Sequence, residues 1–330
     1  MKYIYLLILM CASTVAHAYE WQPDSLNGYE KTTINCENGN RCTIVRKQSP
    51  KSKAGILYVH GYNDYFFQSE MGDRFVDSCY NFYAVDLHGY GRSIRKGEVP
   101  YQSKKFSEYY DDLDSALSVM RADGIDRVAL MGHSNGGLIT SSFMVERPDS
   151  MVEVLMLNSP FLEWNMNGFM KDVAVPMVSG LGRMFPKASI SQGSSTAYGE
   201  SLLSAYHGEW NYNVEWKTMV PRKVTAGWIK MTRDAQNRLK KNKGKIEVPI
   251  LLLHSAMSVK DEKWTELHQK ADAVLDVDDI CNLGSTLGAD VTDVKVYGGL
   301  HDVILSAPKV REGVYDSIFG WLHRYFQPVR

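Results

Sequence analysis

The sequence predicts an α/β protein with a mostly parallel, doubly wound sheet and a helical cap insertion. Short apolar runs alternate with helical patterns along most of the chain, as they do when strands and crossover helices alternate. One run leads directly into a glycine-rich turn, and a long interval interrupts the alternation before the last strands. The chain has 330 residues, 44% of them hydrophobic, so we favour one catalytic domain with an insertion over two independent domains.

The first residues have the pattern of a cleaved export signal. A lysine at position 2 is followed by an apolar stretch over residues 3–11 and by a small-residue cleavage site, which predicts cleavage after Ala18. A lipoprotein signal lipidated at Cys11 is the weaker alternative, because bulky Met10 stands where a small residue is needed. We therefore expect the mature protein to be periplasmic or secreted.

Export places the remaining cysteines in an oxidising compartment. Cys36 and Cys42 flank an Asn-Gly turn signal, so we predict a hairpin in residues 29–47 and a disulfide between these two cysteines. Cys79 and Cys281 are expected to be buried free thiols. The spacing of His and Cys residues does not suggest a metal site.

The alternation of apolar runs defines the catalytic domain, residues 19–158 and 249–330. Amphipathic patterns predict helices over residues 106–120 and 310–325. The predicted strands of the sheet are residues 56–60, 82–86, 128–131, 152–157, 250–253 and 294–297.

The long interval over residues 159–248 is the predicted cap. It is rich in methionine and aromatic residues, and an amphipathic helix is expected over residues 224–239. Adaptable apolar side chains over the strand ends would hold an acyl chain or another apolar group of a substrate. The simpler alternative is that most of these side chains form the core of the cap itself.

The glycine-rich turn, residues 132–137, has the pattern of a nucleophile elbow. An apolar run precedes it, a helical pattern comes after it, and Ser134 occupies the position held out from the turn. The similar stretch over residues 284–288 has no strand before it and is expected to be a loop at a helix end. Ser134 is therefore the candidate nucleophile.

A serine nucleophile needs a histidine base and a carboxylate that orients it, and on this kind of sheet they follow the serine in the order acid, then histidine. His301 lies just beyond the last predicted strand, where active sites of such sheets gather, whereas His323 lies within the last helix. Asp272 is the favoured acid and Asp276 the alternative. Asp276 also belongs to an acidic group typical of a helix start.

Two backbone amides are expected to stabilise the oxyanion. Asn135 follows the nucleophile and supplies the first, and Tyr62, in the loop after an early strand, supplies the second. Gly61 lets the backbone approach the substrate closely. We expect His60 to hold this loop in place.

The motifs together resemble bacterial α/β-hydrolases of the lysophospholipase and monoacylglycerol lipase group, which are serine-aminopeptidase-like. The resemblance covers residues 50–326 and rests on five segments in a fixed order: residues 60–64, 86–93, 132–137, 272–276 and 299–302. It implies the α/β-hydrolase fold, a triad of Ser134, Asp272 and His301, oxyanion amides from Tyr62 and Asn135, and no cofactor. The chain departs from the pattern at residues 254–255 and in an extra stretch over residues 260–270, which bears on the acid.

We therefore expect an exported enzyme that cleaves a carboxylic ester, a lysophospholipid or monoacylglycerol, through an acyl-enzyme. A peptidase or amidase with the same triad, acyl transfer to an alcohol, and a non-catalytic binding protein are the alternatives. The 37 basic and 38 acidic residues nearly balance, which favours a small-molecule partner over nucleic acid. A transient contact with a membrane surface and the oligomeric state are left open.

Overall fold

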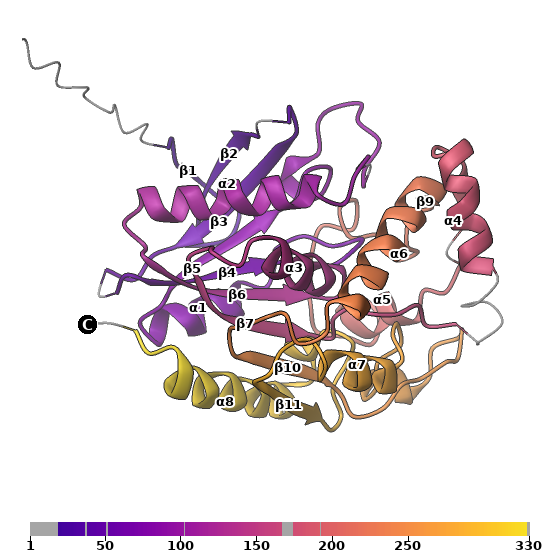
Figure 1. Cartoon of the computed structure of the whole chain (residues 1–330). Helices are drawn as coiled ribbons and strands as arrows, with labels where there is room; N and C mark the ends of the chain where they lie inside the picture. Colours follow the sequence, from indigo (N-terminus) through magenta and orange to yellow (C-terminus); the bar gives the residue numbers. More distant parts are fainter. Residues whose placement is uncertain are drawn as a thin grey trace, which may run out of the picture.

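The computed structural model describes residues 19–36, 38–50, 52–101, 103–166, 174–191 and 193–328. The predicted export signal, residues 1–18, lies outside these ranges. The described chain forms a nine-stranded sheet with helices on both faces (Figure 1). Within the described residues, no helix has the length and apolar character needed to cross a membrane.

The sheet is parallel over most of its width, which confirms the predicted fold class. Six strands pair in parallel, in the spatial order β5 (Asn81–Asp86), β4 (Ala54–Val59), β6 (Arg127–His133), β7 (Val152–Asn158), β10 (Ile250–Ser255) and β11 (Val291–Val296). At the β5 edge, an antiparallel extension adds β3 (Arg41–Lys47), β2 (Glu30–Asn35) and β1 (Gln22–Pro23).

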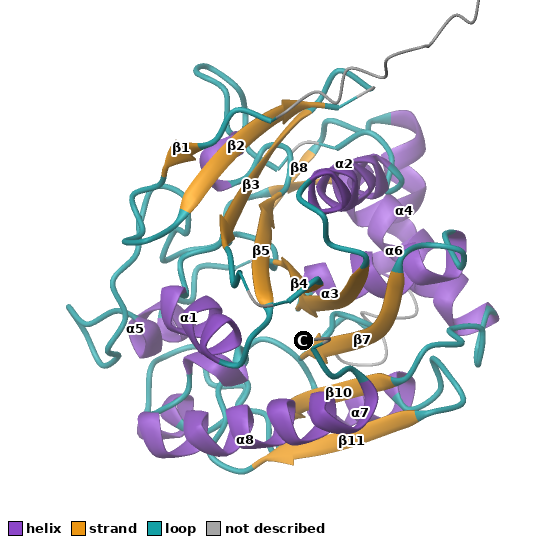
Figure 2. Ribbon diagram, turned by 90° about the vertical axis from the view of Figure 1, so that its left-hand side faces the viewer, coloured by secondary structure: helices purple, strands orange, loops and turns teal. Residues whose placement is uncertain are grey.

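Alternate side chains of the buried strands enter two separate cores. On β4, Leu57 and Val59 join the core beneath α2 (Glu108–Ala122) and α3 (Asn135–Glu146), whereas Ile56 and Tyr58 join the core beneath α1 (Ser69–Asp77) and α8 (Pro308–Tyr325). Figure 2 shows α1 and α2 on opposite sides of the twisted sheet. Helix α7 (Val277–Gly284) packs against β10.

The last strand is the one that differs most from its prediction. The sequence predicts residues 294–297, but β11 begins at Val291 and ends at Val296, and Tyr297 beyond it is 81% exposed. Strand β11 lies at the edge of the sheet and pairs only with β10. Some of its side chains therefore contact solvent, and its sequence lacks the continuous apolar run of a strand buried on both faces.

In its described residues, the long insertion between β7 and β10 contains three α-helices and a small sheet. Helix α6 (Ala226–Lys241) begins at the N-cap Thr225, whose side chain accepts from the amide of Trp228, and it packs against α3 and α4 (Val175–Met184). Strands β8 (Ser189–Ile190) and β9 (Val224–Thr225) pair antiparallel, and α5 (Ala197–Leu202) lies between them in the chain. These elements gather at the right of Figure 1.

The predicted hairpin around Cys36 and Cys42 is present, but the predicted disulfide is not formed. The two sulfurs are 3.7 Å apart, a hydrogen-bonding distance well beyond a covalent bond, and the four described cysteines are all free thiols. Cys42 pairs with Ile34, while Cys36 lies beyond the end of β2, where its amide donates to the carbonyl of Asn40. Cys79 and Cys281, predicted to be buried, are each partly exposed.

Candidate active site

Ser134 occupies the turn between β6 and α3 with a strained backbone. Its φ is 54° and its ψ is −117°, and its amide donates to the carbonyl of Asn158. A Cβ atom on Gly136 would lie 2.3 Å from the carbonyl oxygen of Val59, and one on Gly132 would lie 2.4 Å from Oγ1 of Thr140. The elbow predicted from the sequence is therefore present, and both glycines are required sterically.

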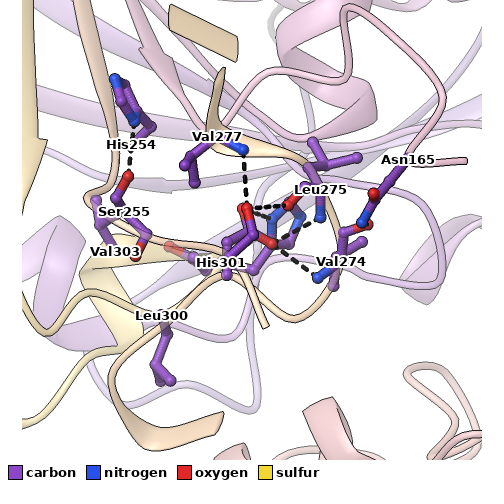
Figure 3. Close-up of polar contacts among 12 residues, drawn as sticks. Asn165, His254, Ser255, Val274, Leu275, Val277, Leu300, His301 and Val303 are labelled. Carbon is purple, nitrogen blue, oxygen red and sulfur yellow. Dashed lines mark hydrogen bonds and ion pairs between the residues drawn. The ribbon is translucent and has the colours of Figure 1, made fainter. Parts of the chain in front are cut away.

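Asp272 and His301 form the hydrogen-bonded pair that a triad needs. His301 Nδ1 lies 2.8 Å from Asp272 Oδ2, and both residues are buried. The other carboxylate oxygen of Asp272 accepts from the amides of Val274 and Leu275, each at 2.7 Å (Figure 3). Asp272 follows β10 and His301 follows β11, so both side chains come from loops at the carboxyl ends of parallel strands.

The alternative acid has a different position and a different partner. Asp276 is the N-cap of α7, and its side chain accepts from the amide of Asp278 at 3.1 Å. A further histidine, His254 of β10, bonds to the carbonyl of Ser255 and to Asp293, as Figure 3 shows for Ser255. Only Asp272, of the two aspartates considered, contacts His301 in the described structure.

The imidazole of His301 lies beside the elbow. The ring of His133, the residue before Ser134, is 4.9 Å from the ring of His301, and the ring of Tyr198 packs edge-on at 5.6 Å. Burial raises the pKa of Tyr198 well above its ordinary value, so its hydroxyl stays neutral. No hydrogen bond joins Ser134 to His301 within the described chain, and such bonds often tighten only when substrate binds.

The loop after β4 approaches the elbow closely. A Cβ atom on Gly61 would lie 3.1 Å from the Cβ of Ser134, so Tyr62 and Asn135, the two predicted amide donors, flank this close approach. His60 is held on both ring nitrogens, by the carbonyl of Gly61 at 2.7 Å and by the amide of Leu87 at 3.1 Å. These contacts fit the expected role of His60 in holding the loop.

The same loop is bound to the insertion, a contact that the sequence did not indicate. Asn63, at a φ of 52°, donates through its amide to the carbonyl of Thr218 at 2.8 Å and accepts from the Thr218 hydroxyl at 2.8 Å. Next to it, Lys217 Nζ donates to Asp64 Oδ1 at 2.8 Å, and both side chains are almost fully buried. We call these contacts the loop clamp. They join residues 63–64 to residues 217–218.

Burial and neighbouring charges act in opposite directions on Asp64. Burial by itself raises the pKa of this carboxyl, but the ammonium of Lys217 and the imidazoles of His133 and His60 lower it below its ordinary value. The Lys217 ammonium also lies over the rings of Phe67, Tyr198 and Tyr212, at 5.7 to 5.9 Å from their centroids. Asp64 is therefore held ionised by a buried cation.

Asn158 connects the elbow to the histidine loop. Its carbonyl accepts from the amide of Ser134, its side-chain amide donates to Asp302 at 2.7 Å, and its side-chain oxygen accepts from the amide of Val303 at 3.2 Å. Sequence reasoning missed this residue. Its position at the end of a strand is the only signal that could have drawn attention to it.

A second Ser-His-Asp chain lies away from the elbow. His88 bonds to Asp112 at 2.6 Å and to the Ser103 hydroxyl at 2.5 Å, and its ring stacks on Tyr109 of α2. Burial lowers the pKa of His88, but the carboxylates of Asp112 and Glu108 raise the pKa by more, so the net shift is upward. This chain joins the segment after β5 to α2.

Among the residues that the structure describes, two groups of side chains have the right residue types to hold a metal ion. They are Cys36, Cys42 and Asp112, and His254, Cys281 and Asp293, with the ligand atoms of each group within 4.8 Å of one another. In both groups these atoms already bond among themselves or to neighbours. Neither group was indicated by the sequence.

Comparison with known proteins places this geometry in a family. Residues 50–262 match the model of the family described as Hydrolase_4, serine aminopeptidase, S33. Human 1-acylglycerol-3-phosphate O-acyltransferase ABHD5 is 28% identical over 139 residues, which cover 40% of this chain and 37% of that protein. Phospholipase YtpA of Bacillus subtilis (strain 168) is 22% identical over 209 residues, covering 61% of this chain and 74% of that protein. The chain thus spans well under half the length of its ABHD5 relatives.

Solved structures share the fold. The monoacylglycerol lipase of Paleococcus ferrophilus superimposes with a TM-score of 0.62 at 21% identity, covering 86% of this chain and 98% of that one. A soluble variant of monoglyceride lipase from Saccharomyces cerevisiae, in complex with a substrate analogue, gives 0.66 at 16% identity and 95% coverage of both chains. Because the family model matches more than half of its residues, the chain belongs to the serine aminopeptidase S33 family and has the α/β-hydrolase fold.

Proposed function

We propose that this protein is an exported serine hydrolase that cleaves carboxylic esters, with Ser134, Asp272 and His301 as its catalytic triad. The observation that carries the proposal is the buried bond between Asp272 and His301 beside a strained serine elbow. Arrangements of this kind activate a serine hydroxyl that is otherwise a weak nucleophile.

Each residue has one role in the proposed reaction. The Ser134 hydroxyl attacks the ester carbonyl while Nε2 of His301 accepts its proton, and Asp272 stabilises the imidazolium and fixes the Nδ1–H tautomer. The backbone amides of Tyr62 and Asn135 stabilise the oxyanion of the tetrahedral intermediate. The intermediate expels the alcohol, which takes the proton from His301, and leaves an acyl-enzyme on Ser134. Water, deprotonated by His301, then releases the acid.

We propose a lysophospholipid or a monoacylglycerol as the substrate. The named activities of YtpA and of the two lipase structures support a lipid ester. We further propose that residues 159–248 act as the cap and 19–158 with 249–330 as the catalytic domain. Aromatic side chains of the insertion, among them the buried Trp164 and Trp228 and the partly buried Tyr198, would contact an apolar substrate group.

Two other acceptors or leaving groups fit the same triad. The family name favours a peptidase or amidase, in which the leaving group is an amine, and the ABHD5 similarity favours acyl transfer to an alcohol. Amide hydrolysis and acyl transfer proceed through the same acyl-enzyme as ester hydrolysis. Only substrate assays, and not the geometry of the triad, therefore distinguish the three reactions.

The test combines active-site variants with a substrate series. Purified protein is assayed on long- and short-chain nitrophenyl esters, monoacylglycerols, lysophospholipids and aminoacyl nitroanilides, alongside Ser134→Ala. We expect ester turnover that Ser134→Ala abolishes. Ester turnover that survives in Ser134→Ala rejects the nucleophile, whereas turnover of the anilides alone moves the proposal to a peptidase.

We also propose that export oxidises Cys36 and Cys42 to a disulfide. The hydrogen bond with Cys42 lowers the pKa of the Cys36 thiol, so Cys36 is the thiolate that would attack a disulfide-containing oxidant. Cys42 then displaces the reduced thiol of that oxidant and closes the bridge. Both the cleavage after Ala18 and the disulfide are tested by alkylating protein from the periplasm or medium without prior reduction and measuring its mass by mass spectrometry. The expected product starts after Ala18 and carries no alkyl group on these two cysteines.

A further inference from the structure

One face of α6 spans the region of the elbow. Trp228, Thr232 and Gln236 are spaced four residues apart and therefore share this face. Gln236 donates to the carbonyl of Phe161 at 3.1 Å, and the amide of Phe161 donates to the carbonyl of Ser134 at 2.9 Å. At the other end of the face, the ring of Trp228 lies 4.9 Å from the ring of Tyr62. Thr232 lies between these two contacts.

Two helices that pack against each other near the elbow, α3 and α6, both carry buried polar atoms without partners. Thr232 is fully buried, and its hydroxyl makes no hydrogen bond in the described part of the chain. Asn135, next to Ser134 and 1% exposed, is unpaired at both its side-chain oxygen and nitrogen, and α3, which it begins, packs against α6. The indole N–H group of Trp164 is unpaired as well.

Unpaired buried polar groups are rare in folded proteins, because each one forfeits its hydrogen bonds to water. Here one of them belongs to the residue next to Ser134 and another to the helix that packs against α3, so both are able to bond to a polar group that enters between these helices. A hydroxyl group donates one hydrogen bond and accepts up to two, so it can pair with both the side-chain amide of Asn135 and the hydroxyl of Thr232. An alkyl group would leave them unpaired.

We propose that the side chains of Asn135 and Thr232 form a subsite that binds a hydroxyl group of the ester substrate close to the scissile bond. The inference rests on the proposed function, with Ser134 as nucleophile. It predicts that the enzyme prefers a hydroxylated ester to the same ester without the hydroxyl. The hydroxyl belongs either to the acyl group or to the alcohol, and one experiment distinguishes these sources.

The experiment compares two pairs of esters. Glycerol 1-monobutyrate against propyl butyrate tests a hydroxyl in the alcohol, and ethyl 3-hydroxybutyrate against ethyl butyrate tests a hydroxyl in the acyl group. For one pair, we expect kcat/KM to be higher for the hydroxylated ester by about tenfold or more, because sites built to bond a hydroxyl reject analogues that lack it. Turnover of the plain esters tests the proposed function separately.

Variants at Thr232 provide the matched control. Thr232→Val keeps the shape but removes the hydroxyl and should bring the ratio within each pair close to one, whereas Thr232→Ser should retain the preference. Asn135→Leu, which keeps the backbone amide, is the second variant and should also reduce the ratio. Thermal unfolding verifies that each variant is folded. Ratios within about twofold for both pairs in the unmodified enzyme, or a preference that Thr232→Val and Asn135→Leu both retain, overturn the subsite.

Discussion

The buried ion pair of the loop clamp allows a quantitative prediction. In Lys217→Met, the ammonium is lost but the carboxylate of Asp64 stays buried, with 1% of its side chain exposed and its Oδ2 already unpaired. If Asp64 stays ionised, an uncompensated buried charge costs about 3–5 kcal/mol. If Asp64 is instead protonated in the folded variant, taking up that proton at pH 7 costs about 4 kcal/mol of folding free energy, since an unfolded aspartate has a pKa of about 3.9. Both routes predict a loss of about 4 kcal/mol at neutral pH.

The protonation route also fixes the pH dependence. The pKa of Asp64 is lowered in the unmodified protein, so the stability it contributes is present above the unfolded pKa and is lost as the pH falls through the folded pKa. In Lys217→Met the folded pKa is instead raised. The penalty of the variant should therefore shrink on acidification, to about 1.5 kcal/mol at pH 5.

Urea unfolding at pH 7 and pH 5, followed by tryptophan fluorescence, measures both values. Lys217→Met combined with Asp64→Asn removes both charges and should restore part of the loss. Lys230→Met is the control, because Lys230 pairs with Asp234 at a partly exposed position on α6 and should change stability by about 0.5 kcal/mol or less. A loss below about 1 kcal/mol at pH 7, or one that does not vary with pH, would refute the reasoning.

Three further predictions concern the site and the fold. Asp272→Asn should lower kcat by about 10⁴-fold, whereas Asp276→Asn should change both kcat and stability little, because asparagine caps a helix as well as aspartate does; steady-state kinetics with urea unfolding would contradict the assignment if the two effects on kcat were reversed. Gly136→Ala should prevent stable folding, since its Cβ would lie 2.3 Å from a backbone carbonyl, whereas Gly320→Ala in α8 meets no atom within 4 Å and should raise the melting temperature. Burial raises the pKa of Asp24, but its hydrogen bonds and ion pair with Arg92 lower the pKa by more, so the net shift is downward. The stability that Asp24 contributes to the folded protein should therefore be lost as the pH falls below about 4. Unchanged stability between pH 5 and pH 2 would exclude this contribution.

The sequence predicted the features that depend on local pattern. An apolar run next to a glycine-rich turn identified the elbow, and a histidine just after a strand identified the loop of His301. The acid was harder, because Asp272 and Asp276 lie only four residues apart, on either side of three apolar residues, and only the fold distinguishes the residue that contacts His301 from the one that caps α7.

Contacts between distant segments left no pattern to detect. Lys217 and Asp64 are 153 residues apart, and a single lysine in a polar and aromatic stretch reads as a surface residue. The hairpin shows the same limit at short range: its turn signal located the bend correctly, but the strand register moved Cys36 past the end of the ladder. Long-range packing and register therefore decided the points that composition and spacing left open.

The order of strands in the sheet determines when the site can exist. Ser134 follows β6 in the middle of the sheet, whereas Asp272 and His301 follow β10 and β11, which are added next to β7 only after the whole insertion has been made. A chain that is still being synthesised, or that is cut within residues 159–248 and loses its C-terminal strands, carries Ser134 without the proposed base, His301. The proposed triad is therefore complete only when the last third of the molecule has folded.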